Sequence, residues 1–238
     1  MDSYAHIKLR REAPPAPATR FSTVDQVFQV LQDRILDLDL PPGARLSEAE
    51  VARQLGCSRQ PVRDAFQRLS QLGLLVIRPQ RATEVSPISR EAILTARFLR
   101  AATEVEMVQL ACTRLGPADH DVLRGHIDAQ ARAFADEDPQ KFKLFDNAFH
   151  ADICAMSGLP RVWDHIVESK FHTDRLCRFS LRTGSQEVLD DHAAILDAIV
   201  ARDGPRAAQA MRTHLDRIKG LVDALQEAQN DWFERPEA

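Results

Sequence analysis

The chain has 238 residues, of which 44% are hydrophobic and 28% are charged. This length and composition allow one large domain or two modest ones with a buried core, and they argue against disorder as the main state. No run approaches the ~18 consecutive apolar residues of a membrane helix, and residues 1–20 are charged and rich in proline, unlike a signal peptide. We therefore expect a cytoplasmic protein without a membrane partner.

The charge is unevenly distributed along the chain. The formal net charge is −4, but residues 45–81 hold seven arginines against three acidic residues, so this segment carries +4 and the remainder −8. Such an asymmetry is expected when one domain meets phosphate and the other does not. The distribution therefore favours a nucleic-acid partner for the N-terminal part.

The first elements are an arm and two helices. Residues 1–20 lack apolar periodicity and are expected to form a flexible arm. Apolar side chains at helical spacing then predict a helix that ends before Pro41. The capping-box pattern of Ser47 and Glu50 predicts a short second helix, which ends at Gly56.

A third helix and a hairpin complete this part. Ser58 is expected to cap the helix, and residues 74–77 and 84–86 read as two strands joined by a tight turn. The order of helix, helix, tight turn, helix and hairpin is typical of a winged helix-turn-helix. We assign this domain to residues 21–88.

Strand signals disappear from Ser89 onward. Glycine and proline breaks divide the region into about six helices of ordinary length. We expect a helical bundle over residues 89–228, followed by a C-terminal tail at residues 229–238. Helices that pack in this way can build ligand or metal sites from inward-pointing side chains.

The third helix carries side chains suited to reading DNA. A turn at Gly56 precedes Ser58, Arg59, Gln60 and Arg63. Arginine can bond a guanine edge bidentately, glutamine can bond an adenine edge, and a helix N-terminus favours phosphate. The alternative is a solvated charged face. Three further arginines are expected to make phosphate or wing contacts: Arg45, Arg78 and Arg81. Arg81, at the wing tip, is also a candidate for reaching the minor groove of the DNA.

Residues 24–89 resemble the GntR family of bacterial transcription regulators. The resemblance rests on these short motifs: Leu46-Ser47-Glu48, Ser58-Arg59, Pro61-Val62-Arg63, Arg78-Pro79 and Pro87-Ile88-Ser89. It implies that Ser58, Arg59, Gln60 and Arg63 contact operator DNA and that homodimers bind short palindromes. One departure is Ala82, because many members of the family carry glycine at the wing tip.

A second group of residues has the chemistry of a metal site. Asp146 and His150 lie four residues apart beside an apolar helix face, so both project from one side of the helix. His192 and His214 each lie in a later amphipathic helix. One aspartate and three histidines suit zinc first, and also nickel, manganese or iron, with open positions for a small carboxylate. The alternative is that they are ordinary core or boundary residues.

Residues 92–222 resemble the FCD ligand-binding domain of the FadR subfamily. Asp146, His150, His192 and His214 match its metal ligands one by one, and Leu99-Arg100 with Glu104 matches its recurrent sequence. The resemblance implies an antiparallel all-α helical bundle whose metal helps to bind a small organic or sugar acid. The fold class is therefore mostly α: an N-terminal winged helix-turn-helix with a small β-hairpin wing, and a C-terminal bundle.

Four residues are candidates for binding the acid: Arg97, Arg100, His172 and Arg178. An inward-pointing arginine could bind a carboxylate bidentately. The alternatives are an exposed basic helix edge and, for Arg100, an ordinary helix-supporting pair with Glu104.

These expectations combine into a DNA-binding transcriptional regulator, a repressor, whose operator affinity is controlled by the acid. Two alternatives remain open. One is a metal-dependent enzyme fused to a DNA-binding domain, although no recognisable general base, nucleophile or glycine-rich phosphate loop accompanies the ligands and we expect no enzyme. The other is a DNA binder with a purely structural metal.

Overall fold

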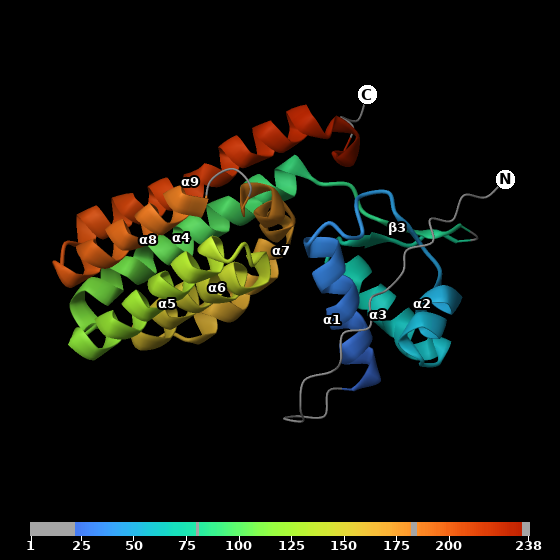
Figure 1. Ribbon diagram of the computed structural model, residues 1–238, viewed down its shortest axis with the longest axis horizontal. Helices are drawn as coiled ribbons and strands as arrows, with labels where there is room; N and C mark the ends of the chain where they lie inside the picture. Colours follow the sequence, from blue (N-terminus) through green and yellow to red (C-terminus); the bar gives the residue numbers. More distant parts are fainter. Residues whose placement is uncertain (1–21, 80, 182–184, 235–238) are drawn as a thin grey trace. The chain divides into compact units, whose positions relative to one another are not determined.

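The computed structural model describes residues 22–79, 81–181 and 185–234 (Figure 1). The chain divides into two compact units. The first, called the winged unit below, comprises Met1–Ile88 and Asp231–Ala238, and the second, called the bundle, comprises Ser89–Asn230. None of the helices in the described ranges is long and apolar enough to cross a membrane.

The winged unit has the predicted order of elements plus one short strand. Its elements are α1 (Thr23–Leu36), β1 (Arg45–Leu46), α2 (Glu48–Leu55), α3 (Arg59–Gln71), β2 (Leu75–Val76) and β3 (Thr83–Val85). The three strands form an antiparallel sheet in the order β1-β3-β2, with Arg45 opposite Glu84 and Leu75 opposite Val85. The winged helix-turn-helix is confirmed. Sequence reasoning missed β1, which has two residues and therefore no visible alternation.

Local sequence explains how α2 and α3 meet. Gly56 ends α2 with a φ of +67°, a left-handed conformation that glycine adopts without strain, and so permits the sharp turn into α3. Ser47 and Ser58 stand at the N-cap positions of α2 and α3, but neither side chain makes a cap hydrogen bond. The expected capping contacts are therefore wrong, although the helix starts are right. An apolar core holds the helices to the sheet through Leu31, Val62, Phe66, Leu69, Leu74 and Val85.

The bundle contains long helices and, in its described residues, no strand. Its helices are α4 (Arg90–Arg114), α5 (Pro117–Ala135), α6 (Pro139–Met156), α7 (Arg161–Leu181), α8 (Ser185–Val200) and α9 (Gly204–Ala228). Helix α4 packs against α9 and α7, whereas α5 packs against α6 and α8 (Figure 1). All six helices contribute buried side chains to one apolar core, among them Val108, Leu123, Phe149, Ile166, Ile195 and Met211. The predicted helical bundle is confirmed.

The segment that follows α9 belongs to the winged unit. After a 3-10 turn at Asn230–Trp232, the Ile88 amide donates to the Trp232 carbonyl at 2.7 Å, and the Glu234 amide donates to the Ile88 carbonyl at 3.0 Å. Phe233 is buried. The expected C-terminal tail therefore contributes a short paired segment to the DNA-binding part of the chain.

Candidate functional site

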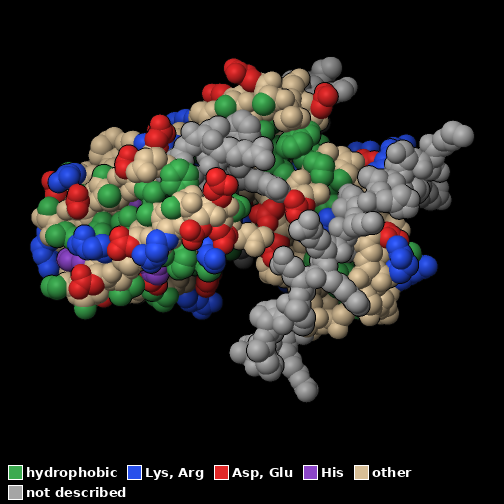
Figure 2. Space-filling view, viewed as in Figure 1, with side chains coloured by type: hydrophobic (Ala, Val, Ile, Leu, Met, Phe, Trp, Pro, Cys, Tyr) green, Lys and Arg blue, Asp and Glu red, His purple; other side chains and the backbone are tan. Residues whose placement is uncertain are grey.

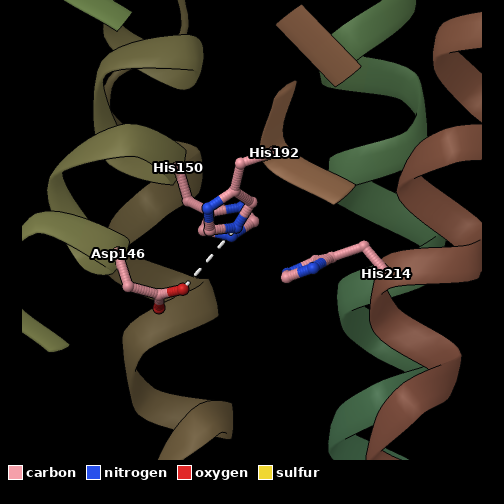
Figure 3. A group of neighbouring side chains, drawn as sticks. All are labelled: Asp146, His150, His192 and His214. Atoms are coloured by element: carbon pink, nitrogen blue, oxygen red, sulfur yellow. Dashed lines mark ion pairs between the residues drawn. The ribbon is translucent and has the colours of Figure 1, made fainter. Parts of the chain in front are cut away.

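The four residues predicted as metal ligands lie together in the bundle. Asp146 and His150 lie one turn apart on α6, His192 lies on α8 and His214 on α9, and one ligand atom from each lies within 4.8 Å of the others. Figure 3 shows the four side chains pointing toward one another. Atoms that bind one ion at about 2.0–2.2 Å are at most about 4.4 Å apart. Small side-chain shifts would therefore bring all four onto a common ion.

All three histidines of the site have a buried ring nitrogen without a hydrogen-bond partner among the described residues. The side chains of His150 and His192 are fully buried. Within the described part of the chain, Nε2 of each has no hydrogen-bond partner, and the Asp146 carboxylate lies 3.6 Å from Nε2 of His192 (Figure 3). Burying an unsatisfied polar atom costs free energy. A metal ion would satisfy both nitrogens, and one carboxylate with three imidazoles is a donor set that fits Zn²⁺.

The surroundings hold these groups in the protonation states that ligands need. Burial alone would raise the pKa of the Asp146 carboxyl, but the Lys170 ammonium, 3.9 Å away, lowers it below its ordinary value. Burial lowers the pKa of His192 well below that of a free imidazole, and it also lowers the pKa of His214. The carboxylate is therefore ionised and these two imidazoles are neutral at neutral pH.

A cavity of about 100 Å³ opens beside Asp146 and His214. Its polar lining comes from all around the site: Arg100, Lys143, Lys170, Thr173, Asp174 and Arg217. Apolar side chains of Phe142, Val188, Leu215, Ile218 and Leu221 complete the wall. A concave site with an apolar wall and a few convergent polar groups is the usual form of a small-molecule site.

The cations of the cavity wall are matched by carboxylates. Arg100 Nε donates to Glu104 Oε1 at 2.5 Å, which confirms the expected pair. Arg217 donates to both oxygens of Asp191. Nζ of Lys170 lies 2.9 Å from Asp174 and Nζ of Lys143 lies 3.4 Å from it. With Asp146, four carboxylates therefore balance four cations around the cavity among the described side chains, leaving aside the exposed Glu187.

The four residues predicted to bind the acid lie in different places relative to the cavity. Arg100 lines the cavity, whereas its wall does not include Arg97, which pairs with Asp216. His172 is half-buried on α7 and is not part of the described wall. The side chain of Arg178 lies outside the described residues. The structure therefore brings only Arg100 of this set to the cavity.

The residues predicted to contact DNA are all exposed on the winged unit. They are Arg45, Ser58, Arg59, Gln60, Arg63, Arg78 and Arg81. Lys and Arg side chains gather at the edge of this unit near α2 (Figure 2). Arg63 donates to both oxygens of Glu48 at 2.9 and 3.1 Å, and Gln60 Nε2 donates to Asp64 at 2.8 Å. Arg63 and Gln60 are thus accessible but held by acidic neighbours.

The wing arginines come together in one hollow. Arg45, Arg78 and Arg81 line a surface depression of about 340 Å³, together with Val76, Ala82 and Glu84. Arg45 Nε donates to Glu84 Oε1 at 3.1 Å across the β1-β3 pair. A concentration of guanidinium groups on a wing is suited to phosphate.

Comparison with known protein families gives the same division of the chain. Residues 23–85 match the family described as bacterial regulatory proteins, gntR family, and residues 96–217 match the FCD domain. The HTH-type transcriptional repressor RspR of Escherichia coli K12 is 31% identical over 210 residues, which are 87% of this chain and 92% of the repressor. The chain belongs to the GntR family, with a C-terminal FCD domain. Its relatives and its fold are those of transcription regulators.

Other similar proteins include a curated transcriptional regulator and two solved structures. A Streptomyces ambofaciens HTH-type transcriptional regulator in an unstable DNA locus is 36% identical over 84% of each chain. A solved GntR transcriptional regulator from Rhodococcus sp. RHA1 covers 84% of this chain and 98% of its own, with a TM-score of 0.69 and 26% identity. Escherichia coli McbR/YncC shares the fold, with a TM-score of 0.72 at 23% identity over 86% of this chain and 99% of its own.

Sequence reasoning missed several residues that build the site of this GntR regulator. Lys143, Lys170, Asp174 and Arg217 line the cavity, and each looks like an ordinary helix charge in the sequence. One signal was available. Lys170 and Asp174 are four residues apart, which favours an ion pair on one helix face. Only the packing of α7 shows that this pair is buried, with 3% and 6% of the side chains exposed.

Proposed function

We propose that the chain is a repressor that binds a palindromic operator as a homodimer, and that a small organic or sugar acid, bound at a metal site in the bundle, controls its operator affinity. The observation that carries this proposal is the set of four ligand atoms within 4.8 Å of one another, beside a cavity. Relatives named as repressors, RspR and the probable D-xylose utilization operon repressor of Paenarthrobacter nicotinovorans, support the sign of regulation.

Asp146, His150, His192 and His214 would hold the metal, and zinc suits this donor set best, with nickel, manganese and iron as the other candidates. A bound divalent ion would supply a Lewis-acid position for a carboxylate oxygen. The cavity beside Asp146 and His214 is where the rest of the acid would lie. Its apolar wall suits a carbon skeleton, and the Lys143 ammonium, with three N–H groups, can donate to a carboxylate.

The charge balance of the site favours an anionic effector. Because four carboxylates already match four cations around the cavity, the charge of a divalent ion would be left uncompensated in a buried site. Uncompensated buried charge is costly. A small acid with one or two negative charges would reduce this cost, so acid and metal are expected to bind cooperatively.

On the DNA side, we assign Arg59, Gln60 and Arg63 to base edges and Ser58 to phosphate. Arg59 is the first residue of α3, and Arg63 lies one turn later on the same exposed face. Arg45, Arg78 and Arg81 would contact the backbone or minor groove from the wing.

Control of DNA binding requires that the acid binds two arrangements of the chain with different affinities. Helix α9 is a candidate for carrying this difference, because it holds His214 and runs on into the segment that pairs with Ile88. A shift of α9 would therefore act on a segment of the winged unit through the continuous chain.

The test is thermal unfolding of the zinc-loaded protein against a panel of organic and sugar acids, with and without chelator. An acid at ~100 times its Kd should add about 2.7 kcal/mol of stability. A rise in melting temperature that disappears after zinc removal, together with changed operator affinity in fluorescence anisotropy, is the expected result. If the acid that raises the melting temperature leaves operator affinity unchanged, the regulatory part of the proposal is wrong.

A further inference from the structure

Each metal-site histidine has a polar partner on the side away from the other ligands. Nδ1 of His150 lies 2.6 Å from Glu104 Oε2, and Nδ1 of His192 lies 2.8 Å from Gln130 Oε1. Nδ1 of His214 lies 3.6 Å from Asp191 Oδ2. These partners lie on α4, α5 and α8. Together with the proposed ligands on α6, α8 and α9, they bring side chains from five helices to the site.

We infer that Gln130 is a positioning residue that selects Nε2 of His192 as the atom that faces the metal, and that the Glu104 carboxylate, 2.6 Å from Nδ1 of His150, favours Nε2 of that histidine by its charge. The inference rests on the proposed metal site. A neutral imidazole has one N–H and one lone pair, and an acceptor at Nδ1 places the N–H there. In His192 the lone pair then lies on Nε2, which is buried without a hydrogen-bond partner among the described residues.

The orientation of Gln130 is itself fixed, which makes its role specific. Its Nε2 donates to the carbonyl of Phe145 at 3.2 Å, so its Oε1 is the atom that remains for His192. Gln130 is fully buried, and Phe149 stacks on the His192 ring with centroids 4.5 Å apart. The ring of His192 is therefore held both in its plane and in its tautomer.

The two carboxylates are held by arginines of the cavity wall. Glu104 accepts from Arg100, and Asp191 accepts from Arg217, which also donates to Glu187 at 2.5 Å. Each arginine thus acts on a histidine through one carboxylate. The arginines therefore hold Glu104 and Asp191 in place beside the histidines.

The test compares Gln130→Leu with wild type in the full-length, chelator-treated protein. Leucine has a similar size but no acceptor. Outer contacts of this kind are worth roughly 10–100-fold in metal affinity, so we expect Zn²⁺ affinity, measured by chelator competition, to fall by about that factor. The visible absorption of the Co²⁺-substituted protein should also change. Gln130→Glu keeps an acceptor for Nδ1 of His192, and its protonated carboxyl can still donate to the carbonyl of Phe145, so it should weaken Zn²⁺ binding and alter the Co²⁺ spectrum less than Gln130→Leu does.

Gln109→Leu is the matched control, because Gln109 is a partly buried glutamine of the same bundle that bonds within its own helix, to Val105 and Glu106. It should leave Zn²⁺ affinity unchanged. A second readout uses the metal-free wild type: ¹H–¹⁵N NMR of its imidazoles should show the proton of His192 on Nδ1.

The outcomes separate the inference from the function on which it rests. Wild-type protein that binds neither Zn²⁺ nor Co²⁺ would overturn the metal site and the inference together. Wild type that binds Zn²⁺ while folded Gln130→Leu binds it equally well, or His192 with its proton on Nε2, would overturn the inference alone. If Gln130→Leu does not fold, Glu104→Gln takes its place, and unchanged Zn²⁺ affinity and Co²⁺ absorption in that variant would contradict the inference.

Discussion

The winged unit and the bundle place their functional charges in opposite environments. On the winged unit, the Arg63–Glu48 pair has 55% and 32% of its side chains exposed. In the bundle, the Glu104–His150 pair has 2% and 0% exposed. Exposed ion pairs contribute little to folding, whereas a buried charge that loses its partner is strongly destabilising. Replacing an exposed charge of the winged unit is therefore expected to cost little stability, whereas the buried charges at the proposed metal and acid site are part of the fold.

The largest expected effect follows from breaking a buried pair. Glu104→Ala should lower the free energy of unfolding of the metal-free protein by about 3–5 kcal/mol, because Arg100 is left buried without its carboxylate. Urea denaturation followed by circular dichroism measures this change. Glu48→Ala, which breaks the exposed pair with Arg63, should leave the unfolding midpoint nearly unchanged. Similar losses in the two variants would remove the contrast between the units.

The second prediction concerns a metal ligand. His192→Ala should lower Zn²⁺ affinity by more than the roughly 100-fold limit of outer contacts, because it removes a ligand atom itself. The metal-free variant should still bind operator DNA. The matched control is His126→Ala, since His126 pairs with Asp152 at 2.7 Å elsewhere in the bundle. Zinc content after dialysis and operator anisotropy measure the two properties, and loss of metal in the control would contradict the assignment.

The third prediction concerns the reading helix. Arg59→Ala should abolish specific operator binding, because removing one bidentate pairing with a base weakens binding roughly 10-fold to 100-fold and a dimer would lack two. Zinc content should stay at the wild-type value. Arg53→Ala, at an exposed arginine of α2 that pairs with Glu50, is the control and should alter operator binding far less. A fall in zinc content in Arg59→Ala would contradict the proposal that the winged unit binds DNA and the bundle binds the metal independently.

The same contrast explains what could be predicted from the sequence. The order of elements in the winged unit and the helical bundle follow from local periodicity and breakers, and the spacing of Asp146 and His150 indicates a shared helix face. Glu104 was visible only as a helix partner of Arg100, and Gln130 had no signal, because their contacts to His150 and His192 join helices far apart in the sequence. Arg97 is a candidate for binding the acid in the sequence, but in the structure it pairs with Asp216. The sequence does not reveal this pair, because the two residues lie on α4 and α9, far apart in the chain.

The smallest expected effect is on the pH dependence. Burial lowers the pKa of His192 and His214, so both stay neutral at pH 6.5, where a free imidazole is about half protonated. Zn²⁺ affinity should therefore change little between about pH 7.5 and 6.5 on account of these two ligands, and fall at lower pH. Isothermal titration with Zn²⁺ at a series of pH values measures this. A marked loss of affinity already at pH 6.5 would contradict the lowered pKa values.

The metal-free protein should show the linked change in stability, in a direction set by the same shift. Because the pKa of His192 is lower in the folded chain than in the unfolded one, the unfolded chain binds more protons below about pH 6.5. The free energy of unfolding should thus be constant above that pH on account of this group and fall as the pH drops below it. His192→Gln removes the titrating group and should flatten this part of the curve. A pH dependence below 6.5 that is the same in this variant as in wild type would contradict the lowered pKa of His192.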